Sequence, residues 1–406
     1  MPSFSDILAK ESIFVDRNVL SPHYIPEILL FREEQIEKIM KVLSPAFKNE
    51  RPHNLFIYGK TGTGKTASVK NIMKKFNDME RKEAVMTYVN CKVYNTRYRI
   101  IQKIAKTYIS ELDKSGFGLT YIYEKLVSWI IENKIRLIIV LDEVDMIKEL
   151  DDLIYTLTRM NDELSEGSVS LLGISNKFNF KDELDARSKS SLYETEMVFT
   201  SYSAIELQEI LKYRSNLGFK KGIVDESAIN LTAAITASEN GDARYALRLL
   251  LKAGEIAEDK NREKITDSEV EEARRNVDED LAAEAIITLP DHQQLVLLSV
   301  ADLDLKGSRY EKLNEEESGF LFSGEVYEEY RRNCKKHKKK PRTARWFQEY
   351  LNDLEMLGLI TMVESGKGIR GHTRLIRIGY SAESLKNIIE RNFRRGSIPT
   401  DSGEVL

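Results

Sequence analysis

The segment "GKTGTGKT", residues Gly59 to Thr66, constrains the fold more than any other stretch of this chain. It matches the pattern G-x-x-x-x-G-K-[S/T], in which the backbone N–H groups of a glycine-rich turn surround phosphate oxygens. With average residue usage, a chain of this length matches by chance about one time in a hundred. The apolar run "HNLFIYG" leads into the turn and the helical pattern "TASVKNIMKKF" follows it, as such a loop requires. The sequence therefore predicts a nucleotide site.

Two side chains of this loop have defined tasks. Lys65 is expected to reach the β- and γ-phosphates, and the Thr66 hydroxyl is expected to bind Mg²⁺. The other positions offer backbone N–H groups, and the helix that follows points its positive end at the phosphates. The predicted nucleotide contacts of the loop are Gly59, Lys60, Thr61, Gly62, Thr63, Gly64, Lys65, Thr66 and Ala67.

The segment "LIIVLDEVD" supplies two acids that complement the phosphate loop. Asp142 falls at the end of an apolar strand, where it can hold Mg²⁺ directly or through water. Glu143 follows it and is placed to polarise an attacking water as a general base. The alternative is a pair of solvated acids at a strand end. It is disfavoured because the two acids directly follow a buried apolar strand, as a magnesium-binding acidic motif requires. Together the two motifs imply ATP binding with hydrolytic capacity.

The next predicted strand, "VSLLGISN", also ends in polar side chains, Ser175 and Asn176. An amide at that position can orient the lytic water or contact the γ-phosphate. Asn is equally common at strand ends because it suits turns. The residues alone leave both roles open for Asn176.

At 406 residues the chain is too long for one ordinary core, and its patterns divide it into three domains. Apolar strands alternate with helices over residues 15–199, which predicts an α/β domain with a parallel sheet covered on both faces. Residues 200–277 predict helices only, two of them opened by the capping-box pairs Ser203–Glu206 and Thr266–Glu269. A third domain follows over 284–395, and 396–406 is a tail without a pattern.

The third domain has the element order of a winged helix. Its helical patterns are followed by the strands "ITMVES" and "HTRLIRIG" around a glycine-rich turn. In this fold the recognition helix enters the major groove of DNA with its N-terminal residues. The last helical pattern, "TARWFQEYLNDLEMLGL", is amphipathic, and we expect four side chains at helical spacing to face the core: Phe347, Leu351, Leu354 and Leu357.

A strongly basic stretch leads into this helix. Residues 331–345 hold nine Lys and Arg and no acid, although the whole chain is acidic, with 65 Asp and Glu against 61 Lys and Arg. A solvated lysine run is the alternative, but its place before a recognition helix and a second basic turn in the hairpin favour DNA binding. Predicted phosphate contacts are Lys338, Lys339, Lys340, Arg342, Lys367 and Arg370, and predicted base contacts are Thr343, Arg345 and Gln348.

Composition and apolar patterning bear on the cellular location of the protein. The longest apolar stretch, "IRLIIVL", is far shorter than the ~20 residues of a membrane span, and the first residues lack a secretory signal pattern. Two cysteines are too few for a disulfide framework. The sequence thus predicts a cytoplasmic, nucleoid-associated protein without a membrane partner.

With these motifs in this order, the chain resembles the AAA+ ATPases. More narrowly, it resembles the archaeal origin recognition and replication initiator family over about residues 15–395. The resemblance implies an AAA+ parallel-sheet ATPase domain, a helical lid domain at 200–277 and a C-terminal winged-helix domain. It also implies a helical insertion that touches DNA, for which residues 111–126 are the best match.

The resemblance assigns further site residues. "LSPHYIPEILLFREEQI" is similar to the family's adenine-binding segment, which implicates Leu20, Tyr24, Pro26 and Arg32. Tyr202 and Arg214 match residues beside the nucleotide at the entry to the lid, and Arg244 matches a lid residue that points at the phosphates. "LDARSKSSL" resembles the arginine-finger box, so Arg187 would reach the ATP of a neighbouring subunit, where an added cation stabilises the transition state. By itself, Arg187 would be a surface arginine near a loop.

The function that follows is an ATP-regulated replication initiator with ATP or ADP and Mg²⁺ as cofactors. It would bind origin duplex DNA, act with other initiator protomers or paralogues, and help recruit or load the replicative helicase. Hydrolysis would be weak and switch-like. The alternatives are a regulatory, signal-transducing ATPase that uses its winged helix for transcription control or protein contacts, and a clamp-loader or remodelling motor.

Overall fold

The structure is a computed structural model that describes residues 11–79, 81–113, 116–192, 194–307, 320–364 and 374–396. The chain divides into two compact units, Met1–Ala273 and Arg274–Leu406, each with its own core. The domain boundaries predicted from the sequence inside the first unit stay predictions.

The first unit contains a parallel five-stranded sheet with the strand order β2-β3-β4-β1-β5. All four neighbouring pairs are parallel, which confirms the predicted α/β fold. The order places β1 and β3 on either side of β4, so the carboxyl ends of these three strands lie beside one another. The strands are β1 (Asn54–Tyr58), β2 (Ala84–Asn90), β3 (Arg136–Asp142), β4 (Ser168–Ser175) and β5 (Glu194–Val198).

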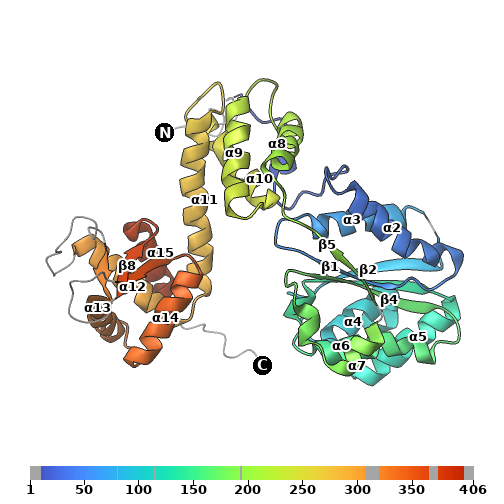
Figure 1. The fold of residues 1–406 in the computed structure, drawn as a ribbon. Coiled ribbons are helices and arrows are strands. Elements are labelled where there is room, and N and C mark those ends of the chain that lie inside the picture. The colour runs from blue at the N-terminus through green and yellow to red at the C-terminus, as the bar shows by residue number, and fades with distance from the viewer. Residues whose placement is uncertain are drawn as a thin grey trace, which may run out of the picture. The chain divides into compact units, whose positions relative to one another are not determined.

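Helices cover both faces of this sheet (Figure 1). One face packs against α2 and α3 through side chains such as Ile39 and Val69, and the other packs against α4 to α7 through side chains such as Ile101 and Leu157. The strands are therefore buried on both faces, as their uninterrupted apolar runs predict. The helices are α2 (Glu33–Leu43), α3 (Lys65–Asn77), α4 (Arg97–Tyr108), α5 (Leu119–Asn133), α6 (Leu150–Glu163) and α7 (Ala186–Leu192).

After β5 the first unit continues as helices only, as predicted. The capping box at the start of α8 is present, with Ser203 and Glu206 bonded reciprocally, and the Glu269 carboxylate accepts from the hydroxyl and N–H of Thr266. The last helix is longer than the predicted 266–277 because no Gly or Pro interrupts the pattern before Pro290. The helices are α8 (Ala204–Gly218), α9 (Glu226–Glu239), α10 (Ala243–Asp259) and the start of α11 (Asp267–Thr288), whose residues from Arg274 onward belong to the second unit.

The second unit is a winged helix, as predicted. Its antiparallel sheet has the order β6-β8-β7, and its helices enclose a core that includes Phe347 and Leu351. The strand β6 and the helix α15 were not predicted. The elements are α12 (Asp291–Lys306), β6 (Leu321–Phe322), α13 (Ser323–Lys336), α14 (Ala344–Met356), β7 (Ile360–Glu364), β8 (Arg374–Ile378) and α15 (Ala382–Gly396).

One predicted core residue of α14 is wrong. Leu357 is 51% exposed, and Leu359 is buried in its place. The helix ends in a Schellman motif, in which the N–H of Leu359 bonds to the carbonyl of Leu354 and the N–H of Gly358 bonds to that of Glu355. Gly358 supplies the left-handed conformation, with φ 70°, that turns the chain back toward the core.

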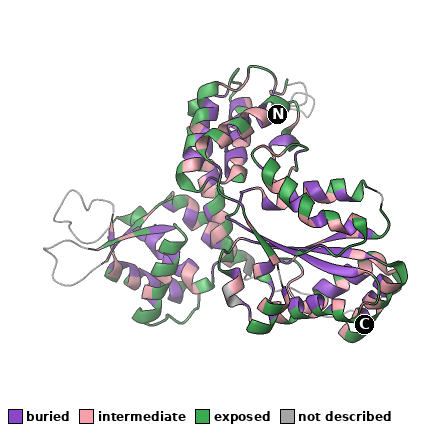
Figure 2. Cartoon of the chain, turned by 45° about the vertical axis from the view of Figure 1, so that its right-hand side comes forward, coloured by how far each residue is buried: buried purple, intermediate pink, exposed green. Residues whose placement is uncertain are grey.

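In each unit the buried residues lie where the helices and strands face one another, and the exposed residues lie on the outside (Figure 2).

Both cysteines, Cys91 and Cys334, are fully buried and form no disulfide bond. Among the residues that the structure describes, no helix combines the length and the apolar character that a bilayer crossing needs.

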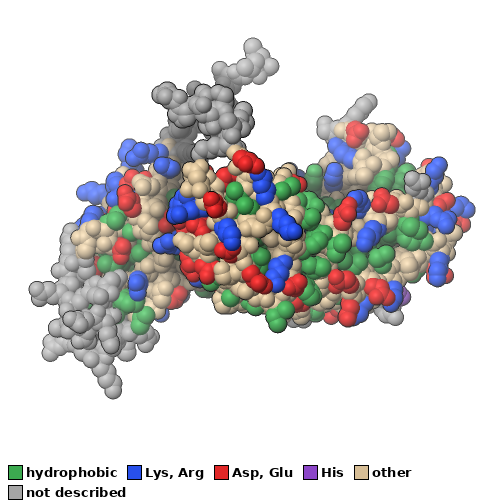
Figure 3. Space-filling model, turned by 90° about the horizontal axis from the view of Figure 1, so that it is seen from above, with side chains coloured by type: hydrophobic (Ala, Val, Ile, Leu, Met, Phe, Trp, Pro, Cys, Tyr) green, Lys and Arg blue, Asp and Glu red, His purple; other side chains and the backbone are tan. Residues whose placement is uncertain are grey.

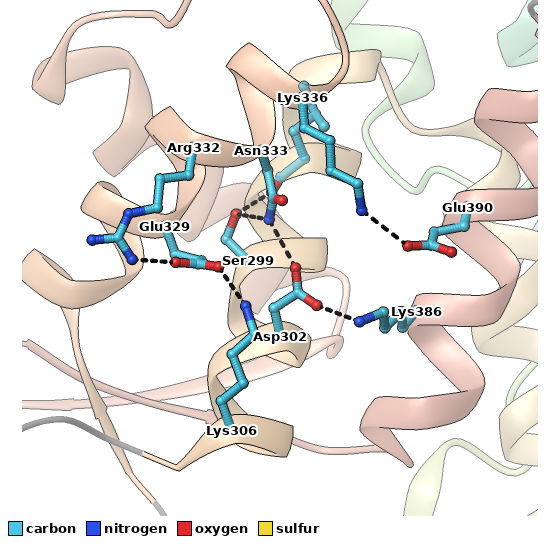
Figure 4. Close-up of polar contacts among 10 residues, drawn as sticks. Ser299, Asp302, Lys306, Glu329, Arg332, Asn333, Lys336, Lys386 and Glu390 are labelled. Carbon is cyan, nitrogen blue, oxygen red and sulfur yellow. Dashed lines mark hydrogen bonds and ion pairs between the residues drawn. The ribbon is translucent and has the colours of Figure 1, made fainter.

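Buried acids join three helices of the winged-helix unit (Figure 4). Asp302 of α12 accepts from Asn333 Nδ2 of α13 at 3.1 Å and from Lys386 Nζ of α15 at 2.7 Å. Beside it, Glu329 of α13 accepts from Lys306 Nζ at 2.8 Å and from Arg332 at 2.9 Å. Each buried carboxylate thus has cationic or amide donors, as the cost of burying charge demands.

The free energy of unfolding of this unit is expected to depend on pH through the ionisation of Asp302. Burial alone would raise the pKa of Asp302, but the bonds from Lys386 and Asn333 outweigh it and hold that pKa below its usual range. A lowered folded-state pKa contributes stability that is present above the unfolded pKa of about 3.9 and is lost as the pH falls through the folded value. Asp302→Asn is expected to lower the free energy of unfolding by about 2 kcal/mol at pH 7 and by less at pH 3.

Urea denaturation between pH 7 and pH 3 tests this, with Trp346 as the only reporter in a Trp129→Phe background. Asp304→Asn, at an exposed position of the same helix, is the control. An equal loss at both pH values would contradict the assignment to the charge of Asp302.

Candidate functional site

A cavity of about 390 Å³ lies at the carboxyl edge of the parallel sheet. The loop between β1 and α3, the ends of β2 and β3 and the residue after β4 form its floor. The segment around Tyr24 and the helices α8 and α10 form its other walls. Fourteen predicted site residues line the cavity: Tyr24, Pro26, Gly62, Thr63, Gly64, Lys65, Thr66, Ala67, Asp142, Glu143, Asn176, Tyr202, Arg214 and Arg244.

The loop has the backbone of a phosphate cradle. Gly62 and Gly64 have φ values of 71° and 89°, which other residues rarely adopt. A Cβ at Gly62 would lie 1.6 Å from Asp242 Oδ1, so the close approach of α10 also requires glycine. The helix α3 begins at Lys65, directly after the loop, and its N-terminal N–H groups face the site of an anion.

Lys65 is held inside the loop. Its Nζ donates to the carbonyls of Gly59 and Lys60 at 2.6 and 2.7 Å and to Asn176 Oδ1 at 3.0 Å. Burial, and next the charge of Arg244, lowers the pKa of Lys65 to about 8. An anion in the cavity would offset both effects. Lys65 thus lies in the cavity wall as a cation that a bound phosphate group would stabilise.

Asp142 and Thr66 fit a magnesium ion. The Thr66 hydroxyl lies 3.0 and 3.2 Å from the two Asp142 carboxylate oxygens, and both residues line the cavity. Hard oxygen donors of this kind are the ligands that Mg²⁺ prefers. Asp142 also accepts from the N–H of Glu143 at 3.1 Å and from the Tyr88 hydroxyl at 2.6 Å.

Glu143 has an unusual backbone and an unsatisfied side chain. Its φ of 56° lies in the left-handed region, which costs a residue with a side chain on the order of 1 kcal/mol. Within the described structure, its Oε2 is buried and has no hydrogen-bond partner. A carboxylate oxygen in this state at the wall of a cavity can accept a proton from a water molecule there.

Arg214 joins α8 to the N-terminal segment. Its Nε donates to the carbonyl of Val19 at 2.5 Å, and its guanidinium lies 4.8 Å from the centre of the Tyr24 ring. Burial lowers the pKa of Arg214 to about 10. Tyr24 reaches the cavity, whereas Leu20 is fully buried and is absent from the cavity wall.

Arg32 lies behind the phosphate loop and not in the cavity wall. Its guanidinium donates to three backbone carbonyls: those of Thr63 at 2.8 Å, Phe31 at 2.7 Å and Thr200 at 2.7 Å. It also lies 3.9 Å from the centre of the Tyr202 ring, and burial lowers its pKa. Arg32 therefore ties three separate segments together around the loop.

The two remaining predicted arginines are exposed. Arg244 is the second residue of α10, after the N-cap Asp242 and Ala243, and lines the cavity. The Arg187 side chain on α7 is 80% exposed, pairs with Asp185 at 3.3 Å and does not line the cavity. Gly59, Lys60 and Thr61 at the start of the loop are also outside the wall, although the first two offer carbonyls to Lys65.

The basic stretch before α14 is a candidate nucleic-acid interface. Sequence reasoning counted no acid in it, but the fold brings acids from elsewhere: Lys339 pairs with Asp291 and Lys336 with Glu390. Lys338, Lys340 and Arg342 are exposed and make no ion pair with any described residue. Figure 3 shows acidic and basic side chains interspersed on the face that it draws.

The helix α14 presents a polar face opposite its buried Phe347. Thr343 is its N-cap residue, and the Arg345 side chain is 90% exposed with only a 3.9 Å contact to Glu349. Gln348 is partly buried, and Asn352 accepts from Arg374 of β8 at 2.7 Å, which links the helix to the wing. The predicted wing contacts Lys367 and Arg370 lie outside the described residues.

Fourteen further residues of the cavity wall were not predicted from the sequence, and two of them lie beside the predicted magnesium ligands. Tyr88 and Lys70 both line the cavity, one from β2 and one from α3. In sequence, Tyr88 is one of many apolar side chains in a strand and Lys70 one of several lysines on a helix. The pairing of Asn90 with Asp142 across the sheet brings Tyr88 beside the acid.

The chain matches known families over most of its length. The family described as "AAA domain" matches residues 49–178, "Cdc6 AAA+ ATPase-type lid domain" matches 208–275, and "CDC6, C terminal winged helix domain" matches 284–388. An ORC1-type DNA replication protein 1 of Archaeoglobus fulgidus is 36% identical over 409 residues, covering 100% of this chain and 97% of the relative. Its counterpart from Sulfurisphaera tokodaii is 39% identical over 394 residues, with 96% of each chain covered.

A solved structure agrees with these relatives. The Aeropyrum pernix ORC1 protein, solved in complex with DNA, is 34% identical and superimposes with a TM-score of 0.77, covering 96% of this chain and 100% of that one. The chain therefore belongs to the family of archaeal ORC1-type DNA replication proteins, built from an AAA+ domain, a lid and a C-terminal winged helix.

Proposed function

We propose that this chain is an ATP-regulated initiator that binds origin duplex DNA and helps recruit the replicative helicase in the cytoplasm. The observation that carries the proposal is the presence of two different sites in one chain. One is a glycine-rich loop with Lys65, Thr66 and Asp142 around a cavity, and the other is a helix that presents Arg345 to solvent.

The cavity is proposed to hold ATP or ADP with Mg²⁺. The loop N–H groups and Lys65 would bind the phosphates, Thr66 and Asp142 would hold the ion, and the segment with Tyr24 and Pro26 would cover the base. The ion would neutralise charge on the phosphates when bound. Asn176, already bonded to Lys65, would orient a water near the γ-phosphate, and Arg244 would approach the phosphates from α10.

Hydrolysis is proposed to be slow and to act as a switch. Glu143 would accept the proton of the attacking water through its unpaired Oε2. Arg187, outside the cavity of its own chain, would complete the site of a neighbouring initiator protomer. A protomer alone would therefore lack one transition-state cation.

DNA binding is proposed to use the second unit. The relative from Aeropyrum pernix was solved with DNA, and this chain shares its fold over nearly its whole length. Lys338, Lys340 and Arg342 would contact phosphates, and Lys339 would do so after leaving Asp291. Such contacts give affinity that falls steeply with salt but carry little sequence information.

Arg345→Ala is expected to weaken binding to an origin fragment about 10-fold and binding to a random duplex less than threefold. Arg345 is exposed at the second position of the helix, where a guanidinium can bond a base edge in the major groove. Fluorescence anisotropy at one salt concentration with both duplexes measures the two losses. Arg391→Ala, an exposed position on α15, is the control. Equal losses on both duplexes would assign Arg345 to the phosphates instead.

The function as a whole is tested by footprinting on chromosomal origin fragments with ATP and with ADP. Protection that depends on nucleotide is the expected result. No protection of any duplex at moderate salt would reject the initiator function and leave a regulatory ATPase. A pull-down with the purified replicative helicase tests recruitment separately.

A further inference from the structure

Tyr88 makes the shortest contact to the carboxylate of Asp142. Its hydroxyl donates to Asp142 Oδ2 at 2.6 Å, whereas Thr66 Oγ1 lies at 3.0 Å from the same oxygen. The side chain extends from β2 into the cavity wall, beside the strand that carries the acid. A short bond from a neutral hydroxyl to a carboxylate is among the stronger hydrogen bonds in proteins.

The ring of Tyr88 is itself held in place. Lys70 of α3 places its Nζ 4.7 Å from the ring centre, within the range of a cation–π contact. Lys70 and Tyr88 both line the cavity, so the chain Lys70–Tyr88–Asp142 runs along one wall of the site. Since α3 also begins with Lys65 and Thr66, one helix supplies both the loop end and the support of this ring.

We propose that Tyr88 is a positioning residue for the magnesium site, which fixes the orientation of the Asp142 carboxylate through its hydroxyl. The inference rests on the proposed nucleotide function and deepens it. Each Asp142 oxygen has a donor at hydrogen-bond distance: Oδ1 takes the N–H of Glu143, and Oδ2 takes Tyr88. Without the Tyr88 hydroxyl, only contacts through Thr66 and Oδ1 would remain, and the carboxylate could rotate about its χ2 bond.

Groups that orient a metal ligand typically contribute 10- to 100-fold to metal affinity. Tyr88 contacts Asp142 and does not belong to the phosphate-binding loop, so its effect on nucleotide affinity should come through the ion. Its loss should therefore change the gain that Mg²⁺ adds to nucleotide affinity, and not the affinity without the ion. A merely structural role would lower both together.

The experiment compares wild type with Tyr88→Phe. ADP affinity is measured by isothermal titration calorimetry with EDTA and with excess Mg²⁺, and the ratio of the two dissociation constants is the readout. Tyr88→Phe is expected to change the EDTA value less than twofold and to reduce the Mg²⁺-dependent gain about 10-fold. A Mg²⁺ titration at fixed ADP should shift to higher concentrations by the same factor.

Tyr58→Phe is a matched control. Tyr58 lies at the end of β1 in the same sheet, and its buried hydroxyl has no hydrogen-bond partner in the described structure. Its removal should leave the Mg²⁺-dependent gain unchanged. If Tyr88→Phe does not fold, Lys70→Met replaces it, with an expected loss of about threefold in the same gain, since only the support of the ring is removed.

Two results would overturn the inference. An unchanged gain in Tyr88→Phe would show that Thr66 and the backbone suffice. A larger gain would show that the hydroxyl competes with the ion for Oδ2. A wild-type protein whose ADP affinity does not depend on Mg²⁺ would instead reject the proposed nucleotide chemistry, so the two failures are distinguishable.

Discussion

Replacing Glu143 by Gln is expected to lower the rate of ATP hydrolysis at least 100-fold, the order of magnitude for loss of a general base. The affinity for ATP should change less than threefold, because the amide has nearly the shape of the carboxylate. Glu143 Oε2 is buried without a partner among the residues that the structure describes, and its backbone has a φ of 56°. A strained backbone and an unpaired buried oxygen both lower stability, and such residues cluster at functional sites. We therefore expect Glu143 to take part in the reaction.

Single-turnover hydrolysis and calorimetric ATP binding measure the two effects separately. Glu124→Gln, at an exposed position on α5, controls for the change of charge. If Glu143→Gln keeps more than one tenth of the wild-type rate, another group acts as the base.

Replacing Arg32 by Lys is expected to lower the free energy of unfolding of the first unit by about 3 kcal/mol. The planar guanidinium serves three carbonyls in different directions and contacts the ring of Tyr202. An ammonium group cannot reach all three, and a buried carbonyl without a donor costs about 1–3 kcal/mol. Because one of the carbonyls belongs to Thr63, ADP affinity should fall about 10-fold as well.

Urea denaturation followed by Trp129 fluorescence, in a Trp346→Phe background, reports on the first unit alone. Arg17→Lys is a matched control, because Arg17 forms a half-exposed pair with Glu258 and should change stability by no more than about 0.5 kcal/mol. A change at Arg32 as small as that at Arg17 would mean that water replaces the lost donors. A change in stability without a loss of ADP affinity would separate Arg32 from the phosphate loop.

Local motifs account for what the sequence could predict. The phosphate loop and the acids after β3 have a fixed spacing, and the capping box at Ser203 joins residues three apart, so their structure follows from neighbours in the chain. The helix α15 was not predicted, although it too has a local helical pattern, with Leu385 and Ile389 buried four residues apart.

What could not be predicted depends on residues far apart in the chain. The burial of Arg32 requires carbonyls from Thr63 and Thr200, and buried arginines are rare enough that no local pattern favours one. The pairing of Lys339 with Asp291 spans 48 residues. Leu357 is exposed because the chain turns at Gly358, whereas the helical periodicity of the sequence continues past that residue. In each case tertiary geometry overrides the local signal.

The burial of both thiols makes the wild-type chain a ready background for site-specific labelling. Cys91 and Cys334 are fully buried, and burial raises the pKa of each, so neither presents a reactive thiolate to a maleimide. A cysteine placed at exposed Lys75 and another at exposed Ile205 would carry the only accessible thiols among the described residues. A donor and acceptor dye at these positions would report the separation of the sheet and the helices α8–α10 as nucleotide is added, without first replacing a native cysteine.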